Sequence, residues 1–458
     1  SIPFFERATG GNSVGVPGTL AGVARALEDY GTLSLEEALQ PAIELARDGY
    51  VMDDYFAEQL ANNAERISQF EATVELYFDE DGNPLPEGTV IVNEDLADTL
   101  ELIAQEGIGV FYNGEIAEDI VETVQNAPAN PGVMETSDLE GYLAVYREPV
   151  TTNYRGYDVF GMNMPTSGGT SLMMMLNVLE AFDLGAMGHG SLDHLSTMAN
   201  AQNIVFSDRN AYMADADFVD VNVDGLLDDS YARERRGMIE SVFEAVETPV
   251  EPGNPPIIMD EEMDEAAFNF DMYSKLAQPD TESVSTTHYS IVDSDRNMVS
   301  VTSTIELLFG SGIVVEGRGF LLNNELTDFS AQPVDENGDP IANAAAGGKM
   351  ERRTALGDDA TTMGGKRPRS SMAPTLVLLD GEPFMAVGSP GGSRIIGYNL
   401  NAITNVIDFD MDVQQAVNMP RVVARNGGVN IDSEWFTPEV VGALEARGFE
   451  VRDGNTGS

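Results

Sequence analysis

The hydrophobic pattern of the chain changes near residue 285. Before this point apolar residues recur at helical spacing, and after it short β-branched-rich runs alternate with turn residues. The segment from Ser34 to Glu37 is a capping box in front of an apolar stripe, so we expect a helix that ends near Gly49. We expect Asn93 to cap a second helix, which ends before Gly107. The first half is therefore predicted to consist of helices interleaved with short strands.

Residues 171–182 are apolar on nearly all sides and include the consecutive methionines Met173 to Met175. A helix that is hydrophobic all round is typical of a protein core. We therefore predict a buried helix here, in preference to a role of the thioethers as ligands.

A β-hairpin is predicted from the β-branched-rich runs at 286–293 and 298–305, which flank a polar turn at 294–297. If Asp293 faces Asn297, the register places Thr286 opposite Thr304, with both hydroxyls on one face. A slip of one residue would move these hydroxyls to opposite faces. On its local sequence alone, Thr286 is interpreted as an ordinary β-branched strand residue.

A second hairpin is expected from residues 375–379 and 383–387, around an Asp-Gly turn. It leads into a glycine-rich turn that contains Gly391 and Gly392, and a helix is expected to start near Ser393. Glycines between a strand and a helix allow backbone N–H groups to point at a developing oxyanion. The alternative is a tight turn without a chemical role.

Residues 331–365 are rich in Gly, Ala and Asp with little periodicity, so we expect a loop or an insertion. Six of the 24 basic residues of the chain lie within 21 positions, inside this segment or just beyond its end: Lys349, Arg352, Arg353, Lys366, Arg367 and Arg369. They are either tied to the acidic surface or steer anionic peptides toward the protein.

The charge of the chain is strongly negative, with 77 acidic against 24 basic residues and a net charge of −53. Such self-repulsion opposes compaction in dilute buffer but is screened over about 3 Å at molar salt. We interpret the composition as salt adaptation, the alternative being an ordinary acidic protein. Nucleic acid and anionic membranes are disfavoured as partners, because both attract clusters of Lys and Arg. The sequence contains no run of about 18 apolar residues, so no membrane span is predicted.

The chain has no cysteine and only three histidines, which excludes disulfides, thiolate catalysis and cysteine-ligated zinc. Motifs of the nucleophile elbow, the P-loop and the dinucleotide-binding turn are absent from the sequence. We therefore expect no cofactor. The chain opens at Ser1 without a methionine or an apolar leader, so we expect a processed or trimmed product.

One acidic stretch resembles the first part of a calcium-binding loop, because Asp220, Asn222, Asp224 and Asp228 have the spacing of ligands in such loops. The twelfth position is Tyr231 rather than the bidentate glutamate of such loops. We interpret these acids as salt-adapted surface and predict no metal site.

Four segments of the second half occur in the order that is found in one enzyme family. They begin at Thr286, Leu321, Arg367 and Gly388, and read Thr-Thr-His-Tyr-Ser, Leu-Leu-Asn-Asn-Glu-Leu-Thr-Asp-Phe, Arg-Pro-Arg-Ser-Ser-Met-Ala-Pro-Thr and Gly-Ser-Pro-Gly-Gly-Ser-Arg. Together they resemble the small-subunit signature of the γ-glutamyltransferases, which are N-terminal-nucleophile hydrolases. Upstream segments that start at residues 15, 41, 165 and 208 resemble landmarks of the large subunit. The resemblance covers residues 15–455.

The resemblance implies an α+β fold of the four-layer αββα type, with two stacked, mainly antiparallel sheets between helices. A doubly wound sheet is the less favoured alternative, because the strand-rich half lacks crossover helices. Residues 1–285 would form the large-subunit portion, with its first part missing, and residues 286–458 the small-subunit portion. Together they are expected to form one structural domain, and the two fragments to associate as a heterodimer.

The resemblance makes Thr286 the nucleophile. Its hydroxyl would attack the carbonyl of Ser285 and cut the chain there by an N-to-O acyl shift followed by hydrolysis. The freed α-amino group, with an ordinary pKa of about 8, would then serve as the general base. Thr304 would orient Thr286, and the N–H groups of Gly391 and Gly392 would form the oxyanion hole.

The same resemblance assigns the substrate-binding residues. Asp328 and Glu325 would bind the α-ammonium group of the substrate, and Glu306 would add further negative charge. Ser370 and Ser371 would bind its α-carboxylate. The arginine that clamps this carboxylate in the family cannot be placed in this sequence, because Arg7 lies too close to the motif at Gly15 to match it.

The function implied is transfer of a γ-glutamyl group from glutathione or a related amide to water, an amino acid or a peptide. One alternative is a cephalosporin (glutaryl) acylase on the same scaffold, whose substrate has no α-ammonium group. The other is a processing-defective homologue that acts as a binding protein. We expect a periplasmic or extracellular protein in a high-salt environment.

Overall fold

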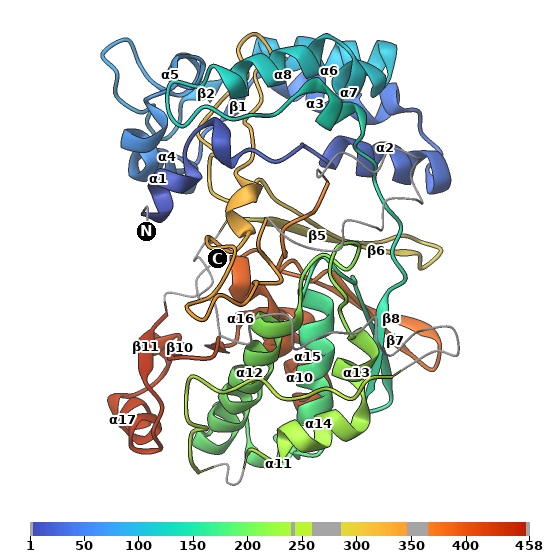
Figure 1. Ribbon diagram of the computed structural model, residues 1–458, viewed down its shortest axis with the longest axis vertical. Helices are drawn as coiled ribbons and strands as arrows, with labels where there is room; N and C mark the ends of the chain where they lie inside the picture. The colour runs from blue at the N-terminus through green and yellow to red at the C-terminus, as the bar shows by residue number, and fades with distance from the viewer. Residues whose placement is uncertain (1–2, 240–242, 259–284, 346–364, 455–458) are drawn as a thin grey trace. The chain divides into compact units, whose positions relative to one another are not determined.

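The computed structural model describes residues 3–239, 243–258, 285–345 and 365–454. The chain forms two compact units (Figure 1). Unit 1 comprises Ser1–Tyr146 and Thr304–Thr327, and unit 2 comprises Arg147–Ser303 and Asp328–Ser458. Each unit therefore contains residues from both sides of position 285.

Unit 1 is mainly helical, with one short antiparallel strand pair. Its helices are α1 (Phe4–Ala8), η1 (Gly11–Ser13), α2 (Thr19–Tyr30), α3 (Leu35–Asp48), α4 (Asp54–Ile67), α5 (Glu71–Tyr77), α6 (Glu94–Glu106), α7 (Gly109–Asn113), α8 (Glu115–Gln125) and α9 (Thr136–Glu140), and its strands are β1 (Tyr50–Val51) and β2 (Val90–Ile91). The two predicted helix starts are confirmed. Ser34 and Glu37 form the capping box of α3, and the Asn93 side chain accepts a hydrogen bond from Leu96 N at the start of α6.

The segment 304–327 is part of the core of unit 1, although it lies far from the other residues of this unit in the sequence. Its Val315 and Leu322 belong to the same buried cluster as Ile116 and Ile120 of α8. The hydroxyl of Thr73 in α5 donates to the carbonyl of residue 312 at 2.7 Å. Burial of these side chains anchors the segment in unit 1.

Unit 2 contains the main sheet and the longest helices. The strands are β3 (Val150–Tyr154), β4 (Tyr157–Gly161), β5 (Thr287–Val292), β6 (Met298–Ser303), β7 (Thr375–Leu379), β8 (Glu382–Val387), β9 (Val422–Ala424), β10 (Val429–Ile431) and β11 (Val451–Asp453). The helices are α10 (Gly168–Leu179), α11 (Leu184–Met187), α12 (Leu192–Tyr212), α13 (Val223–Leu227), α14 (Asp229–Arg236), η6 (Gly392–Arg394), α15 (Ile395–Phe409), α16 (Val413–Asn418), η7 (Ser433–Trp435) and α17 (Pro438–Ala446). A further 3₁₀ helix, η4 (Glu325–Asp328), ends at the boundary between the units.

The main sheet has the strand order β3-β4-β7-β8 and is antiparallel throughout its described strands, unlike a doubly wound sheet. Helix α10 packs on β3 and β4 and lies beside α12 and α15 (Figure 1). The three helices and the sheet enclose a large core that includes Met173, Phe206, Val377 and Leu400. Among the described residues, no helix is both long enough and apolar enough to cross a bilayer.

The all-apolar helix predicted at 171–182 is confirmed as α10, and its three methionines are buried. The predicted boundaries are wrong, because the helix begins at Gly168 and ends at Leu179. Glycine disfavours a helix on propensity alone, but a Cβ at Gly169 would lie 2.2 Å from the carbonyl oxygen of Met162. The close approach of the helix to the strand therefore requires glycine at this position.

Both predicted hairpins are confirmed. In β5–β6 the pairs Thr287–Ser303 to Val292–Met298 follow the expected register, and Asp293 N donates to the carbonyl of Asn297 at 3.1 Å. The β5–β6 hairpin contacts β7 and β8. The other hairpin, β7–β8, begins its second strand one residue earlier than predicted, and β7 also pairs with β4 of the first half.

Candidate functional site

The residues predicted to carry the chemistry are divided between the two units. Unit 1 holds Thr304, Glu306 and Glu325. Unit 2 holds Ser285, Thr286, Asp328, Ser370, Ser371, Gly391 and Gly392.

Thr286 directly precedes β5, and Thr304 directly follows β6. The confirmed register is the one on which their predicted pairing depends. The Oγ1 hydroxyl of Thr286 donates to the carbonyl oxygen of Ser285 at 2.5 Å. The hydroxyl therefore lies beside the carbonyl group that it would have to attack in self-cleavage.

One face of the β5–β6 hairpin is polar. The ring nitrogens of His288 lie 2.8 Å from Thr302 Oγ1 and 3.0 Å from Ser290 Oγ, and burial lowers the pKa of this histidine. Strand residues two apart share a face, so continuing the alternation of β5 by one residue would place Thr286 on the same face as His288. Both ring nitrogens already contact hydroxyl groups, so this imidazole is poorly suited to be the base for Thr286.

The glycine-rich turn lies next to this polar face. A Cβ at Gly388 would overlap the ring of His288, and Ser300 Oγ donates to the carbonyl of Val387 at 3.1 Å. The turn thus starts beside the strand that follows Thr286. Gly391 and Gly392 have φ values of +134° and +57°, a backbone conformation that glycine adopts readily. Their N–H groups have no hydrogen-bond acceptor within the described part of the chain.

Ser370 and Ser371 lie on a segment that forms a parallel bridge from Ser370 to Thr166. The Oγ of Ser370 accepts a hydrogen bond from Met372 N at 3.1 Å. The Oγ of Ser371 accepts one from the guanidinium of Arg209 at 2.6 Å. Each hydroxyl thus uses an oxygen lone pair internally, which leaves its proton to donate to an anion.

Asn343, which the sequence reasoning missed, connects two predicted binding segments of unit 2. Its Nδ2 donates to the carbonyl of Asp328 at 2.8 Å, and its Oδ1 accepts from Arg369 N at 2.9 Å. The side chain is 4% exposed. It therefore holds the backbone of Asp328 close to the segment that carries Ser370 and Ser371.

The three site residues of unit 1 take part in hydrogen bonds with one another or with Asn323 and Asn324. Thr304 Oγ1 accepts a hydrogen bond from Glu306 N at 2.8 Å. Asn324 Nδ2 donates to the buried carboxylate of Glu306, and Glu325 N donates to the side chain of Asn323 at 3.0 Å. The group includes two carboxylates, a suitable environment for a cationic amine.

The described basic residues near the predicted loop are tied to the protein. Lys366 Nζ donates to the carbonyls of residues 342 and 344, both at 2.8 Å, and burial lowers its pKa to about 8. Arg367 N donates to Asp215, and the Arg369 guanidinium donates to carbonyls of the last turn of α12. Lys349, Arg352 and Arg353 lie outside the described residues. For the described half of the basic group, the structure supports attachment to the protein over steering.

The calcium-like stretch is used for helix capping. The side chain of Asn222 accepts from Gly225 N at the start of α13, and Asp228 accepts from Ser230 N at the start of α14. These oxygens are therefore occupied by backbone N–H groups. The residues that the structure describes contain no cluster of three His, Asp or Glu side chains arranged for a metal ion.

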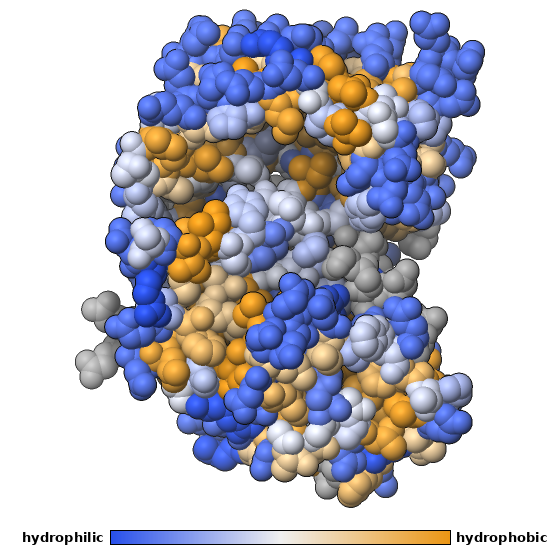
Figure 2. Space-filling model, turned by 180° about the vertical axis from the view of Figure 1, so that it is seen from behind, coloured by the Kyte–Doolittle hydropathy of each residue, from blue (hydrophilic) through white to orange (hydrophobic). Residues whose placement is uncertain are grey.

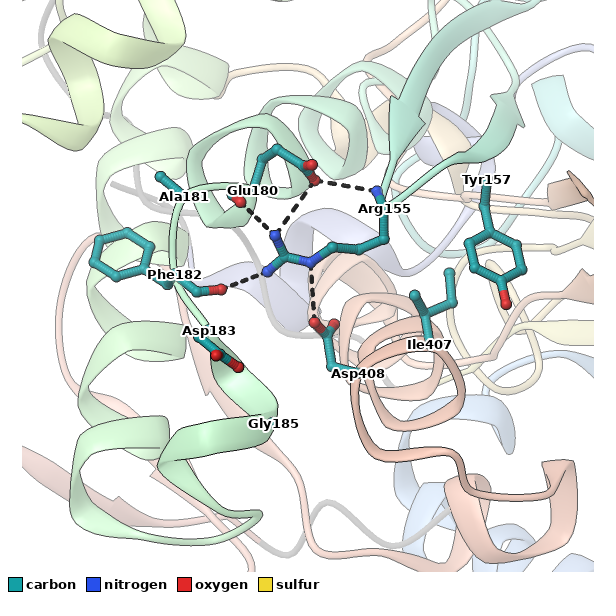
Figure 3. Close-up of a pocket in the computed structure, with 9 residues that line it drawn as sticks. All are labelled: Arg155, Tyr157, Glu180, Ala181, Phe182, Asp183, Gly185, Ile407 and Asp408. Carbon is teal, nitrogen blue, oxygen red and sulfur yellow. Dashed lines mark hydrogen bonds and ion pairs between the residues drawn. The ribbon is translucent and has the colours of Figure 1, made fainter.

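A polar cavity of about 500 Å³ opens in unit 2 between the β3–β4 turn, the end of α10 and α15 (Figure 3). The guanidinium of Arg155 pairs with Asp408 at 3.1 Å and donates to backbone carbonyls at the end of α10. Tyr154 donates to the same carboxylate at 2.7 Å. The polar groups of this cavity thus hold helices to the sheet, and no predicted site residue lines it.

Comparison with known proteins assigns the family. Residues 5–458 match the family model described as gamma-glutamyltranspeptidase. The chain is 38% identical over 439 residues to a glutathione hydrolase proenzyme from Escherichia coli (strain K12), covering 95% of this chain and 69% of that protein. The chain belongs to the γ-glutamyltranspeptidase family.

Acylases are also among the relatives of this γ-glutamyltranspeptidase-family chain. It is 35% identical to the acylase ACY 1 proenzyme of Pseudomonas sp. (strain SE83), over 97% of this chain and 70% of that protein. The crystal structure of cephalosporin acylase from Bacillus halodurans superimposes with a TM-score of 0.77 and 25% identity, covering 98% of this chain and 73% of that one. The predicted α+β fold of the N-terminal-nucleophile hydrolases is thereby confirmed.

Proposed function

We propose that this protein is a γ-glutamyl amide hydrolase or transferase that cuts its own chain between Ser285 and Thr286. The observation that carries the proposal is Thr286 itself. Its hydroxyl lies 2.5 Å from the carbonyl oxygen of Ser285, and the chain matches the gamma-glutamyltranspeptidase family model. The relatives named as proenzymes support a maturation step of this kind.

Maturation would begin with attack of Thr286 Oγ1 on the carbonyl carbon of Ser285. The acyl group moves from the nitrogen to the oxygen of Thr286, and water then hydrolyses the resulting ester. This releases a carboxylate on Ser285 and a free α-amino group on Thr286. The amino group can accept the hydroxyl proton in later cycles, because its ordinary pKa is near 8.

In catalysis Thr286 would attack the γ-carbonyl of the substrate, release the amine and form a γ-glutamyl ester. Thr304 would orient the attacking hydroxyl. The Gly391 and Gly392 N–H groups would stabilise the oxyanion, an interaction worth roughly 3 kcal/mol for each donor in other enzymes. Water or an amine acceptor would then take the acyl group.

Substrate recognition would use two sets of residues. Ser370 and Ser371 would donate to the α-carboxylate, whereas Asp328 and Glu325 would bind the α-ammonium group, with Glu306 adding negative charge. The internal hydrogen bonds of the two serines support the assignment to a carboxylate, since each keeps its own proton for an acceptor.

The fragments 1–285 and 286–458 would stay together as a heterodimer. Strand β4 of the first fragment pairs with β7 of the second over five residue pairs. Segment 304–327 of the second fragment is buried in the core of unit 1. These contacts support the view that the two fragments stay associated after cleavage, because each unit contains residues of both.

A glutaryl acylase is the second candidate, supported by the acylases among the relatives. A glutaryl group keeps the terminal carboxylate but lacks the α-ammonium group. The carboxylates of Asp328, Glu325 and Glu306 would then have no cationic partner on the substrate. Their presence favours the γ-glutamyl substrate.

We further propose that the protein works in the periplasm or outside the cell, in a salt-rich medium. Support comes from the net charge of −53 and from the sharing of scarce cations. Arg47, for example, contacts Glu94, Asp98 and Glu101. Hydrophilic residues also cover much of the face shown in Figure 2. Cell fractionation and activity measured across NaCl concentrations would test both statements.

The proposed function is tested by a denaturing gel and two substrates. Wild type should give two fragments, the smaller with the N-terminal sequence Thr-Thr-His-Tyr-Ser, and should release aniline from its γ-glutamyl derivative faster than from its glutaryl derivative. Thr286→Ala should stay uncut and inactive. The matched control Thr287→Ala changes the exposed neighbour on the opposite face of β5 and should behave as wild type. An active wild type that remains uncut would contradict the proposal.

A further inference from the structure

Arg209 is a buried cation next to the proposed carboxylate site of unit 2. It lies in the last turn of α12, is 1% exposed and is among the largest fully buried side chains. Its Nε donates to Ser167 Oγ at 2.8 Å, and one terminal nitrogen donates to Ser371 Oγ at 2.6 Å. The guanidinium also donates to Asn210 Oδ1 at 3.0 Å.

The direction of these hydrogen bonds follows from the chemistry of arginine. A guanidinium has donors and no acceptor, so the oxygens of Ser167 and Ser371 must accept from it. Ser167 passes its own proton to the carbonyl of Ser370 at 2.8 Å, and Ser167 N donates to the same carbonyl at 2.8 Å. One planar group thus fixes both the backbone of Ser370 and the hydroxyl of Ser371.

Because the oxygen of Ser371 accepts a hydrogen bond from Arg209, its hydroxyl can donate its own proton to an anion. The positive charge of Arg209 also lies one hydroxyl group away from any anion that Ser371 binds, and it is shielded from water by burial. Both effects favour a carboxylate over a neutral group at this position.

We infer that Arg209 is a positioning residue that makes the site selective for acyl groups with an α-carboxylate, acting through Ser371 and Ser167. The inference rests on the proposed function. Arg209 would thus place a buried cation behind the hydroxyl that binds the carboxylate. Arg209 acts on the substrate through Ser371 and does not need to touch it.

The test compares two anilides, the γ-glutamyl derivative and the 4-aminobutyryl derivative, which lacks only the carboxylate. Arg209→Lys keeps the charge but cannot bridge Ser167 and Ser371 as a planar fork. Arg209→Lys should lower kcat/KM for the γ-glutamyl anilide by roughly 10- to 100-fold, mainly through KM, which is the effect of losing one hydrogen bond to a charged group. For the 4-aminobutyryl anilide the change should stay within about threefold.

Three further variants make the test specific. Ser167→Ala should show the same substrate selectivity with a smaller loss, and it replaces Arg209→Lys if that protein fails to fold. In a Ser371→Ala background, Arg209→Lys should have little further effect on kcat/KM, because the oriented hydroxyl is gone. Arg235→Lys alters the buried pair with Asp208, the residue before Arg209 in α12, without changing a contact of Ser167 or Ser371, and should affect both anilides equally.

The outcomes separate the inference from the proposed function. A wild type that cleaves neither anilide overturns the proposed function, and the inference falls with it. An active wild type whose Arg209→Lys and Ser167→Ala variants lose activity equally on both anilides overturns the inference alone. Additive effects of Arg209→Lys and Ser371→Ala also overturn it.

Discussion

The buried histidine of α12 should make unit 2 sensitive to acid. His194 is 2% exposed, its Nδ1 accepts a hydrogen bond from Gly190 N at 3.2 Å, and Phe409 packs edge-to-face against its ring. Burial, together with the neighbouring His189, lowers its pKa to about 3. The folded protein therefore keeps this imidazole neutral at pH values where the unfolded chain binds a proton.

The sign and size of the effect follow from linkage. The stability contributed by the neutral imidazole is fully present above the unfolded pKa of about 6.5 and is lost as the pH falls toward the folded pKa. At pH 5 an unfolded-state histidine is about 97% protonated, so the loss amounts to about 2 kcal/mol relative to pH 8. It approaches 4–5 kcal/mol, to order of magnitude, near pH 3. The value at pH 5 hardly depends on the folded pKa, as long as that pKa stays below about 4.

Urea unfolding at constant salt, at pH 8 and pH 5, measures this difference. The single tryptophan, Trp435, lies in unit 2 and provides the signal. His194→Asn keeps a hydrogen-bond acceptor for Gly190 N. From pH 8 to pH 5, the free energy of unfolding of wild type should fall by about 2 kcal/mol more than that of His194→Asn. The control Phe409→Leu should lower stability equally at both pH values. An unchanged pH dependence in His194→Asn would refute the reasoning.

Three further predictions concern the turn, the cavity and the charge. Gly391→Ala should lower kcat about 100-fold or more in steady-state assays with the γ-glutamyl anilide, because its Cβ would lie 2.6 Å from the Tyr398 ring and displace the N–H donors; unchanged kcat would remove them from the oxyanion hole. Arg155→Met should lower the free energy of unfolding by about 3 kcal/mol, because Asp408 would be left buried without its cation, while KM stays unchanged. Melting temperature should rise as NaCl is increased from 0.1 to about 2 M, since screening weakens repulsion among the acids, and a flat or falling curve would argue against salt adaptation.

Features that depend on neighbouring residues could be predicted from the sequence. The caps at Ser34 and Asn93 were predictable because a side chain there bonds to an N–H group three residues ahead. The hairpin register followed from the turn between Asp293 and Asn297 and from alternation along the strands. The helix start at Gly168 could not be predicted, because glycine disfavours a helix on local propensity. It is required there by close packing against Met372, which is remote in the sequence.

The candidate site was predictable only in part, for the same reason. The residues of the family motifs, including Thr286 and Gly391, could be located by their order along the chain. Arg209 and Asn343 could not be assigned a role, because the bond from Arg209 to Ser371 joins residues 162 positions apart. No local pattern distinguishes such an arginine from an ordinary charged residue at the end of a helix.

The interleaved path of the chain affects how the mature protein would persist. Before the cut at position 285, refolding is a unimolecular reaction of one chain. After the cut, the two polypeptides would have to find each other again, and the shorter one contributes to the cores of both units. Recovery from unfolding would then depend on concentration, and the lifetime of the active form would be set by its unfolding rate rather than by its equilibrium stability. Self-cleavage would in this way make folding practically a one-time event.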